Sequence, residues 1–130
     1  MMSVVANGGK LVRPHLVQKI GDTYIPPPEP RLTGLKENVI KRVREATRKV
    51  VNDEQGTGKN AKVPGTVVAG KTGSAENPTG RTHAWFAGYA PYDDPRVAIV
   101  VFIEHGGHGG LEPARIAKGL FEEAKKRGYL

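Results

Sequence analysis

AGKTGSAE, residues 69–76, followed by HAWFAGYA, residues 83–90, is the stretch that decides the fold. Together the runs at residues 66–72, 83–90 and 96–104 are rich in Val, Ile, Thr and aromatic residues and are bounded by Gly, Pro and Asp, which is typical of strands. The pattern predicts three strands, over Thr66–Thr72, His83–Ala90 and Arg96–Glu104. Pro91–Pro95 joins the last two strands with a connection of hairpin length, which favours antiparallel pairing.

Amphipathic helices flank these strands. Apolar residues recur at helical spacing between Gly34 and Asp53, and again from Pro113 to Gly128, with Lys and Arg on the opposite face. The expected buried positions are Leu35, Val39, Ile40, Val43, Ala46, Val50 and Val51 in the first helix, and Ile116, Ala117, Leu120, Phe121 and Ala124 in the second. The predicted fold class is α+β, a three-stranded antiparallel sheet with flanking helices in one domain.

The other segments are predicted to form the end of a helix and several connecting loops. Met1–Asn7 is apolar and stops at two glycines, as a helix does at its C-terminus. Leu11–Ile20 contains a proline that excludes a helix, and a Gly-Asp turn signal and a proline-rich loop follow it. Gln55–Pro64 carries two glycines and predicts a mobile loop.

The composition excludes several classes of protein. The 130 residues include no Cys, which excludes a disulfide scaffold, a Cys-ligated zinc site and a thiol nucleophile. The longest apolar run, Val97–Ile103, is far shorter than the roughly 20 residues that span a membrane. The first residues lack the basic and apolar regions of a signal peptide, so we expect neither a signal nor an anchor in this chain.

The net charge of +7 is compatible with a nucleic-acid partner, an anionic surface or a solvated basic face. The basic residues lie mainly on the outer faces of the two predicted helices, without interleaved aromatic residues. We therefore expect a solvated basic face and no nucleic-acid partner.

Two apparent site motifs are weak. Gly65–Thr72 matches G-x-x-x-x-G-K-[ST], but a phosphate loop needs a strand before its first glycine and a helix after its lysine. Here strand-forming residues lie within the match and Gly and Pro follow it, so we expect no bound nucleotide. His105 and His108, near Glu104 and Glu112, have the chemistry of metal ligands, but the surrounding glycines give no rigid support. We expect solvent-facing histidines in a turn, no metal and no cofactor.

Lys71-Thr72-Gly73-Ser74 is a third candidate site. In an extended chain Thr72 and Ser74 share one face, and Lys71 and Gly73 share the other. A cation, two hydroxyls and a glycine that admits a ligand against the backbone suit a strand edge that recognises an anion. The segment by itself leaves open the alternative of an ordinary strand end with a solvated lysine.

Several segments, in chain order, resemble the class B penicillin-binding proteins, those of the penicillin-binding protein 2 type in particular. They are residues 6–17 (ANGGKLVRPHLV), 69–76, 83–91 (HAWFAGYAP) and 97–104, with the glycines and the helix that follow. The resemblance covers essentially the whole chain. It implies that residues 1–130 are the C-terminal portion of a transpeptidase domain with the β-lactamase/transpeptidase-like fold, whose other part adds two strands and a helical subdomain.

That family cross-links peptidoglycan stem peptides by acyl transfer and is acylated by β-lactams. It uses three motifs: Ser-x-x-Lys with the nucleophile, Ser-x-Asn and Lys-Thr-Gly. Only the third is present, because neither Ser3 nor Ser74 begins either of the other two. The resemblance thus implies a serine-type D,D-transpeptidase whose present segment is inactive alone. It also implies the extracytoplasmic (periplasmic) side of the inner membrane, with an anchor outside this chain.

The resemblance assigns roles to four residues. Lys71 would raise the local positive potential and bond toward the absent Ser-x-Asn serine, and the backbone N–H of Ser74 would be an oxyanion-hole donor. Thr72 and Ser74 would hold the carboxylate of the substrate or β-lactam with their hydroxyls. Gly73 would let the acyl-donor peptide lie along the strand. Ser74 stands where the family more usually has Thr, which keeps the hydroxyl.

Further expectations concern the rest of the sheet. We expect His83 and Trp85 to serve core packing and cross-strand pairing. One sheet edge is expected to be unpaired, which predicts self-association or exchange of elements. The expected partner is the upstream part of the same domain. Two other function classes stay open: a non-catalytic module that binds D-Ala-D-Ala peptides, and a basic nucleic-acid-binding protein whose affinity falls steeply with salt.

Overall fold

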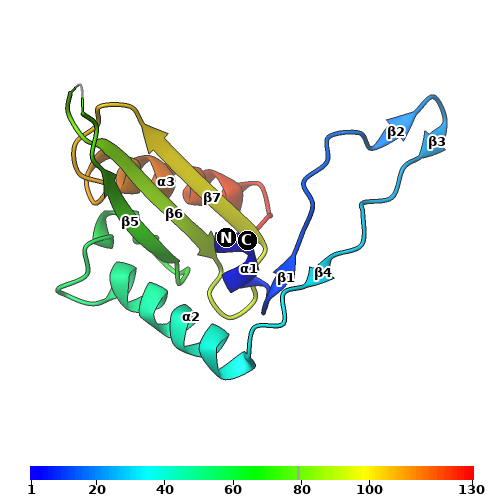
Figure 1. Cartoon of the computed structure of the whole chain (residues 1–130), viewed down its shortest axis with the longest axis horizontal. Coiled ribbons are helices and arrows are strands. Elements are labelled where there is room, and N and C mark those ends of the chain that lie inside the picture. Colours follow the sequence, from blue (N-terminus) through cyan, green and yellow to red (C-terminus); the bar gives the residue numbers. More distant parts are fainter. Residues whose placement is uncertain (79) are drawn as a thin grey trace.

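The computed structural model describes residues 1–78 and 80–130 (Figure 1). Its helices are α1 (Met2–Ala6), α2 (Glu37–Asn52) and α3 (Glu112–Lys126), together with the 3₁₀ helix η1 (Lys59–Ala61). Its strands are β1 (Lys10–Leu11), β2 (Lys19–Ile20), β3 (Thr23–Tyr24), β4 (Arg31–Leu32), β5 (Ala69–Ala75), β6 (His83–Ala90) and β7 (Val97–Ile103).

The main sheet has the antiparallel order β5-β6-β7, which confirms the α+β fold and the three strands. The prediction for the first strand was wrong in its bounds, because residues 63–66 form a turn, with an isolated bridge between Val63 and Thr66 and positive φ at Gly65. The strand therefore begins at Ala69 and runs to Ala75. As a result Lys71–Ser74 lies wholly within β5, whereas a phosphate loop would place its lysine at the start of a helix.

The larger core lies between the sheet and α3. Phe86, Val101 and Phe121 are buried there, and both phenylalanines are fully buried. Truncating such a Phe to Ala costs about 3–5 kcal/mol of stability. On the opposite face of the sheet, the apolar side chains of α1 pack against Ala69 and Tyr89, with Ala87 and Tyr92 partly buried beside them. Helix α2 runs along β5 (Figure 1), and its Arg44 lies over the ring of Tyr89.

The predicted apolar faces of the helices are only partly buried. Ile116 and Leu120 of α3 are 44% and 47% exposed, and Leu35, Val39 and Val43 at α2 are exposed as well. The buried α2 positions are Ile40, Thr47 and Val51, and those of α3 are Pro113, Ala114, Ala117 and Phe121. Helical periodicity predicts that every apolar position on one face is buried, whereas the rest of this chain buries only a narrower stripe of each helix. Both helices thus keep apolar side chains exposed in the described structure.

The segment between α2 and β5 is folded onto the core, so its prediction as a mobile loop was wrong. The N–H of Gly58 donates to the carbonyl oxygen of Val50 at 2.8 Å. η1 follows, and Ala61 and Val63 are buried in the core. The apolar side chains at positions 61 and 63 anchor the segment, which the glycines alone did not indicate.

Residues 10–33, which we call the arm, project from the body of the molecule (Figure 1). Short pairings of β1 with β4 and β2 with β3 hold the arm together, and it contains the turn expected at Gly21. Most of its side chains are exposed, including those of Leu16, Ile20 and Leu32.

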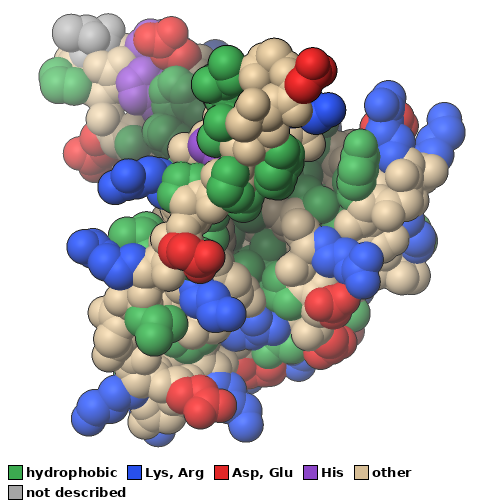
Figure 2. Space-filling view, turned by 90° about the vertical axis from the view of Figure 1, so that its right-hand side faces the viewer, with side chains coloured by type: hydrophobic (Ala, Val, Ile, Leu, Met, Phe, Trp, Pro, Cys, Tyr) green, Lys and Arg blue, Asp and Glu red, His purple; other side chains and the backbone are tan. Residues whose placement is uncertain are grey.

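The basic residues are spread over the surface. Figure 2 shows one face, on which Lys and Arg side chains are distributed with Asp and Glu side chains among them, and hydrophobic side chains gather between them. Five ion pairs are present in the described residues, and four of them join residues three or four positions apart within or at the end of a helix. No helix in the described part of the chain has the length and apolar character needed to cross a membrane.

Candidate functional site

A cleft of about 620 Å³ lies against β5, within the range of small-molecule sites. Three segments that are far apart in the sequence line it. They are the turn before η1 (Gly56, Thr57, Lys59 and Asn60), the strand segment Lys71–Ser74, and the loop before α3 (His108, Gly109, Gly110 and Leu111). All four candidate residues of β5 therefore line one cleft.

The hydroxyl groups of two threonines meet in this cleft. The Thr57 Oγ1 lies 2.9 Å from the Thr72 Oγ1, and either can donate the hydrogen bond. The Lys71 ammonium group donates a hydrogen bond to the carbonyl oxygen of Thr72, the next residue in the same strand. The cleft thus gathers hydroxyl groups and the ammonium group of Lys71, with Lys59 also in its lining, and these groups can together bind a carboxylate.

The register of the sheet agrees with the expected alternation of faces. Thr72 pairs with Phe86, which belongs to the core on the α3 side, and Gly73 pairs with Trp85. Alternate residues along a strand face opposite sides, so Thr72 and Ser74 lie on the α3 side and Lys71 and Gly73 on the other. Side chains from both faces can line the cleft because β5 is an outer strand of the sheet.

β5 pairs only with β6 among the described residues, so its other edge carries no strand. In an antiparallel pair, alternate residues direct their N–H and C=O groups away from the partner strand. An extended peptide can therefore add to this edge through backbone hydrogen bonds.

Aromatic side chains cover the sheet beside the cleft. The rings of Trp85 and Phe102 are 4.3 Å apart between centroids, and the His83 ring is 5.4 Å from that of Phe102. The predicted cross-strand pairing is thus confirmed. The prediction of core packing was wrong for Trp85, which is 39% exposed, because no element of the described chain covers this part of the sheet.

The two histidines of the last loop have different surroundings. The backbone N–H of His105 donates to the Nδ1 of His83 at 3.1 Å, and the His105 ring contacts the carbonyl oxygen of Arg81. His108 lines the cleft. Within residues 1–78 and 80–130, no three His, Asp or Glu side chains lie close enough to hold a metal ion together.

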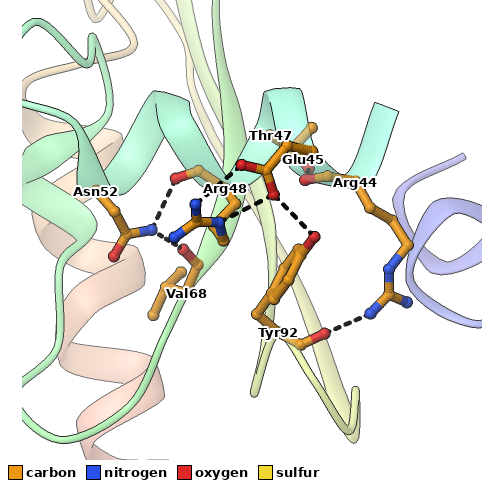
Figure 3. Close-up of polar contacts among 7 residues, drawn as sticks. All are labelled: Arg44, Glu45, Thr47, Arg48, Asn52, Val68 and Tyr92. Atoms are coloured by element: carbon orange, nitrogen blue, oxygen red, sulfur yellow. Dashed lines mark hydrogen bonds and ion pairs between the residues drawn. The ribbon is translucent and has the colours of Figure 1, made fainter. Parts of the chain in front are cut away.

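A polar network between α2 and the sheet supports the start of β5 (Figure 3). The Asn52 amide donates to the carbonyl oxygen of Val68 at 2.8 Å and to that of Arg48 at 2.7 Å. Arg48 makes two hydrogen bonds to the carboxylate of Glu45, which also accepts one from the Tyr92 hydroxyl. The bonded Arg48 guanidinium holds the pKa of the Glu45 carboxyl below its usual range.

Arg44 joins α1, α2 and the turn between β6 and β7. Its guanidinium donates to the carbonyl oxygens of Ala6 and Tyr92. It also lies over the rings of Tyr89 and Tyr92, 5.6 and 5.2 Å from their centroids. These contacts fix the end of the sheet away from Ser74.

Sequence reasoning missed Thr57, Asn60 and Gly109, and it named His108 as a possible metal ligand without placing it at this site. The available signal was the presence of small residues, because glycines flank Thr57 on both sides and four glycines surround His108. Glycines allow close backbone approach, and these two glycine-rich segments both lie against Lys71–Ser74.

Comparison with known proteins now identifies the family. Residues 1–122 match the family model of the penicillin binding protein transpeptidase domain, and the chain belongs to this family. It is 30% identical to a peptidoglycan D,D-transpeptidase, MrdA, of Haemophilus influenzae over 92% of this chain and 22% of that protein. It is also 30% identical to a peptidoglycan D,D-transpeptidase, PbpA, of Mycobacterium tuberculosis, over 94% of this chain and 27% of that protein.

Solved structures show the same fold. The D,D-transpeptidase domain of a peptidoglycan glycosyltransferase from Eggerthella lenta superposes with a TM-score of 0.79 at 32% identity, over 98% of this chain and 31% of that one. The imipenem acyl-enzyme complex of penicillin-binding protein A from M. tuberculosis superposes with a TM-score of 0.79 at 29% identity, over 95% and 29% of the two chains. The chain thus spans between a fifth and a third of the length of these relatives.

Proposed function

We propose that residues 1–130 are the C-terminal portion of a peptidoglycan D,D-transpeptidase domain and supply the strand that receives the acyl donor. The observation that carries this proposal is the cleft, in which Lys71–Ser74 of an outer strand meets the hydroxyl of Thr57. The identity to peptidoglycan D,D-transpeptidases over nearly the whole chain supports the substrate class.

The hydroxyls of Thr72 and Ser74 bind the carboxylate at the end of the stem peptide, or the equivalent carboxylate of a β-lactam. Lys71 supplies the positive charge, and a charge-assisted hydrogen bond is about twice as strong as a neutral one. Thr57 orients the Thr72 hydroxyl, because the 2.9 Å contact between them leaves that hydroxyl a defined set of directions.

The backbone N–H of Ser74 is one donor of the oxyanion hole. In acyl transfer, a serine oxygen attacks the carbonyl of the donor peptide, and the carbonyl oxygen gains negative charge in the tetrahedral intermediate. Removing one oxyanion donor typically costs about 3–4 kcal/mol of transition-state stabilisation. The acyl donor lies extended along the free edge of β5, where Gly73 has no side chain to obstruct it.

The attacking serine and its base come from another part of the same transpeptidase. The 130 residues contain neither Ser-x-x-Lys nor Ser-x-Asn. The upstream part of the domain is therefore the partner, and it would cover the sheet face that carries Trp85 and Phe102. Because peptidoglycan is cross-linked outside the cytoplasm, the domain would act on the extracytoplasmic side of the membrane.

Labelling with a fluorescent penicillin tests the proposal. We expect no covalent label on the 130-residue chain, and label on the same chain joined to the upstream part of the H. influenzae relative's domain. Thr72→Val in the joined protein should reduce the labelling rate at least ten-fold, because a carboxylate hydroxyl is lost. Thr23→Val in the arm is the matched control and should leave that rate unchanged.

Two outcomes would contradict the proposal. Covalent labelling of the isolated chain would show a nucleophile within the 130 residues. A joined protein that folds and stays unlabelled would show that this chain does not complete the site. Reversible binding of D-Ala-D-Ala peptides by the isolated chain, without labelling of the joined protein, would favour a binding module.

A further inference from the structure

Gly109 lies against the backbone of the two paired residues Gly73 and Trp85. A Cβ atom added to Gly109 would lie 2.3 Å from the carbonyl oxygen of Gly73, 2.8 Å from its nitrogen and 2.2 Å from the carbonyl oxygen of Trp85. Real Cβ atoms essentially never approach another heavy atom within 3.0 Å. Because all three obstructing atoms belong to the backbone of a sheet, no side-chain rotation can relieve the contact.

Glycine is required at position 109 because a side chain would clash there, and not because of its backbone conformation. Its φ lies outside the left-handed region, unlike those of Gly107 and Gly128. A Cβ on Gly73 would instead meet the side chain of Trp85 at an ordinary 3.4 Å, with nothing from the last loop within 4 Å. Gly109 therefore contacts β5 from the face on which Thr72 and Ser74 lie.

The loop that carries Gly109 is itself fixed. The Asn60 amide donates to the carbonyl oxygen of Gly110 at 2.8 Å. A Cβ on Gly110 would lie 2.3 Å from the carbonyl oxygen of Thr57, so the loop is packed against the turn before η1 as well. Pro113 and Ala114 then bury the start of α3 in the core. The loop therefore holds Gly109 at a fixed position between the start of α3 and the middle of Lys71–Ser74.

We propose that Gly109 is a positioning residue of the transpeptidase site. Its direct contact with the Gly73 backbone sets where the neighbouring Ser74 N–H and Thr72 hydroxyl lie. This inference adds a residue to the proposed function, and its claim about catalysis rests on that proposed function. Relieving the contact of an alanine at position 109 needs a displacement of more than half an ångström between the loop and β5. Productive site geometry tolerates about half an ångström, and an error of about 1 Å can cost 10²-fold in rate.

The test compares Gly109→Ala with Gly119→Ala. A Cβ on Gly119, within α3, would meet nothing within 4 Å, so this control makes the same chemical change in open space. In the chain joined to the upstream part of the H. influenzae relative's domain, we expect Gly109→Ala to slow β-lactam acylation by roughly 10- to 100-fold, with Gly119→Ala within two-fold of the parent. The loss should fall on the acylation rate constant and not only on the reversible affinity.

A second measurement does not depend on activity. Amide NMR of the 130-residue chain should show shifts at Gly73, Ser74 and Trp85 in Gly109→Ala, and none there in Gly119→Ala. If the joined parent is not acylated, the proposed function fails, while these shifts still report on the contact. Unchanged Gly73 and Ser74 amides together with an unchanged acylation rate would overturn the proposal.

Asn60→Ala provides a variant that adds no atoms. It removes the hydrogen bond to the Gly110 carbonyl oxygen, and we expect faster amide exchange at Gly73 and Ser74 with a several-fold slower acylation. If Gly109→Ala does not fold, Asn60→Ala becomes the test of the positioning role. Parent-like exchange and acylation in Asn60→Ala would then overturn the positioning role.

Discussion

The hydroxyl oxygens of Thr57 and Thr72 lie 2.9 Å apart, although fifteen positions separate the two residues in the chain. The contact exists because the segment after α2 turns back at Gly58 and is anchored by η1, so that Thr57 lies beside the middle of β5. A hydroxyl that the sequence placed in a loop is thereby part of the candidate carboxylate site.

Thr57→Val should weaken β-lactam acylation of the joined protein by several-fold, up to about ten-fold. One neutral hydrogen bond is worth about 1 kcal/mol, and its loss leaves the Thr72 hydroxyl less well oriented. Thr57→Ser keeps the hydroxyl and should recover most of the rate. The measurement is the acylation rate with a fluorescent penicillin. Equal rates for the Val and Ser variants would remove Thr57 from the site.

Lys71→Met should reduce acylation by about 10²-fold without lowering the thermal stability of the chain, because the Lys71 side chain is exposed and its charge is needed only for the ligand. Lys19→Met, in the arm, changes the net charge equally and should leave acylation unchanged. Equal losses in the two variants would point to overall charge instead of a local role for Lys71.

Asn52→Ala should destabilise the chain by about 1–3 kcal/mol. The substitution leaves the buried carbonyl oxygen of Val68 without its side-chain donor, directly before the start of β5 (Figure 3). Asn38→Ala, at an exposed position of the same helix, is the control and should change the unfolding free energy little. Urea unfolding of the parent and both variants measures the difference, and similar values for the two variants would count against this role of Asn52.

Acid should weaken the contact between α2 and the turn at Tyr92. Arg48 lowers the pKa of Glu45 in the folded chain below the ordinary value of 4.5, so in the acidic range the folded state binds fewer protons than the unfolded state. The stabilisation is present above the ordinary pKa and is lost as the pH falls through the lowered one. Glu45→Gln should therefore show a shallower loss of stability than the parent between about pH 6 and pH 3. Glu29→Gln in the arm should keep the parent slope, and a parent-like slope in Glu45→Gln would rule out this contribution.

The 130-residue chain should associate as its concentration rises. β5 and β7 are both outer strands of the described sheet, and the apolar side chains of Trp85, Val100 and Phe102 are exposed beside them. Sedimentation velocity across a range of concentrations measures this. A single monomeric species at the highest concentration would contradict the expectation, and joining the upstream part should reduce association.

The strands and helices could be predicted because their signals are local. The aromatic-rich run at His83–Ala90 and the helical period before Asp53 describe elements that each form from neighbouring residues. The start of β5 could not be predicted, because the bridge between Val63 and Thr66 competes with strand formation there. The exposed Ile116 and Leu120 were missed because periodicity records a side chain's polarity and not which other element covers it.

The candidate site was predictable only along β5. Lys71–Ser74 was recognised because a motif lies within consecutive residues, whereas Thr57, Asn60 and Gly109 reach it through tertiary packing. Glycine at position 109 is required by atoms of residues 73 and 85, and the surrounding glycines indicate a close approach without indicating which residues are approached.

The loop before α3 closes the cleft with a part of the chain that is synthesised after β5. Translation adds about 5–20 residues per second. Lys71–Ser74 therefore leaves the ribosome well before Gly109 and before the Phe121 that holds α3 on the sheet. Until those residues emerge, Gly73 lacks its contact with Gly109, so a nascent chain carries the motif before it can form the cleft.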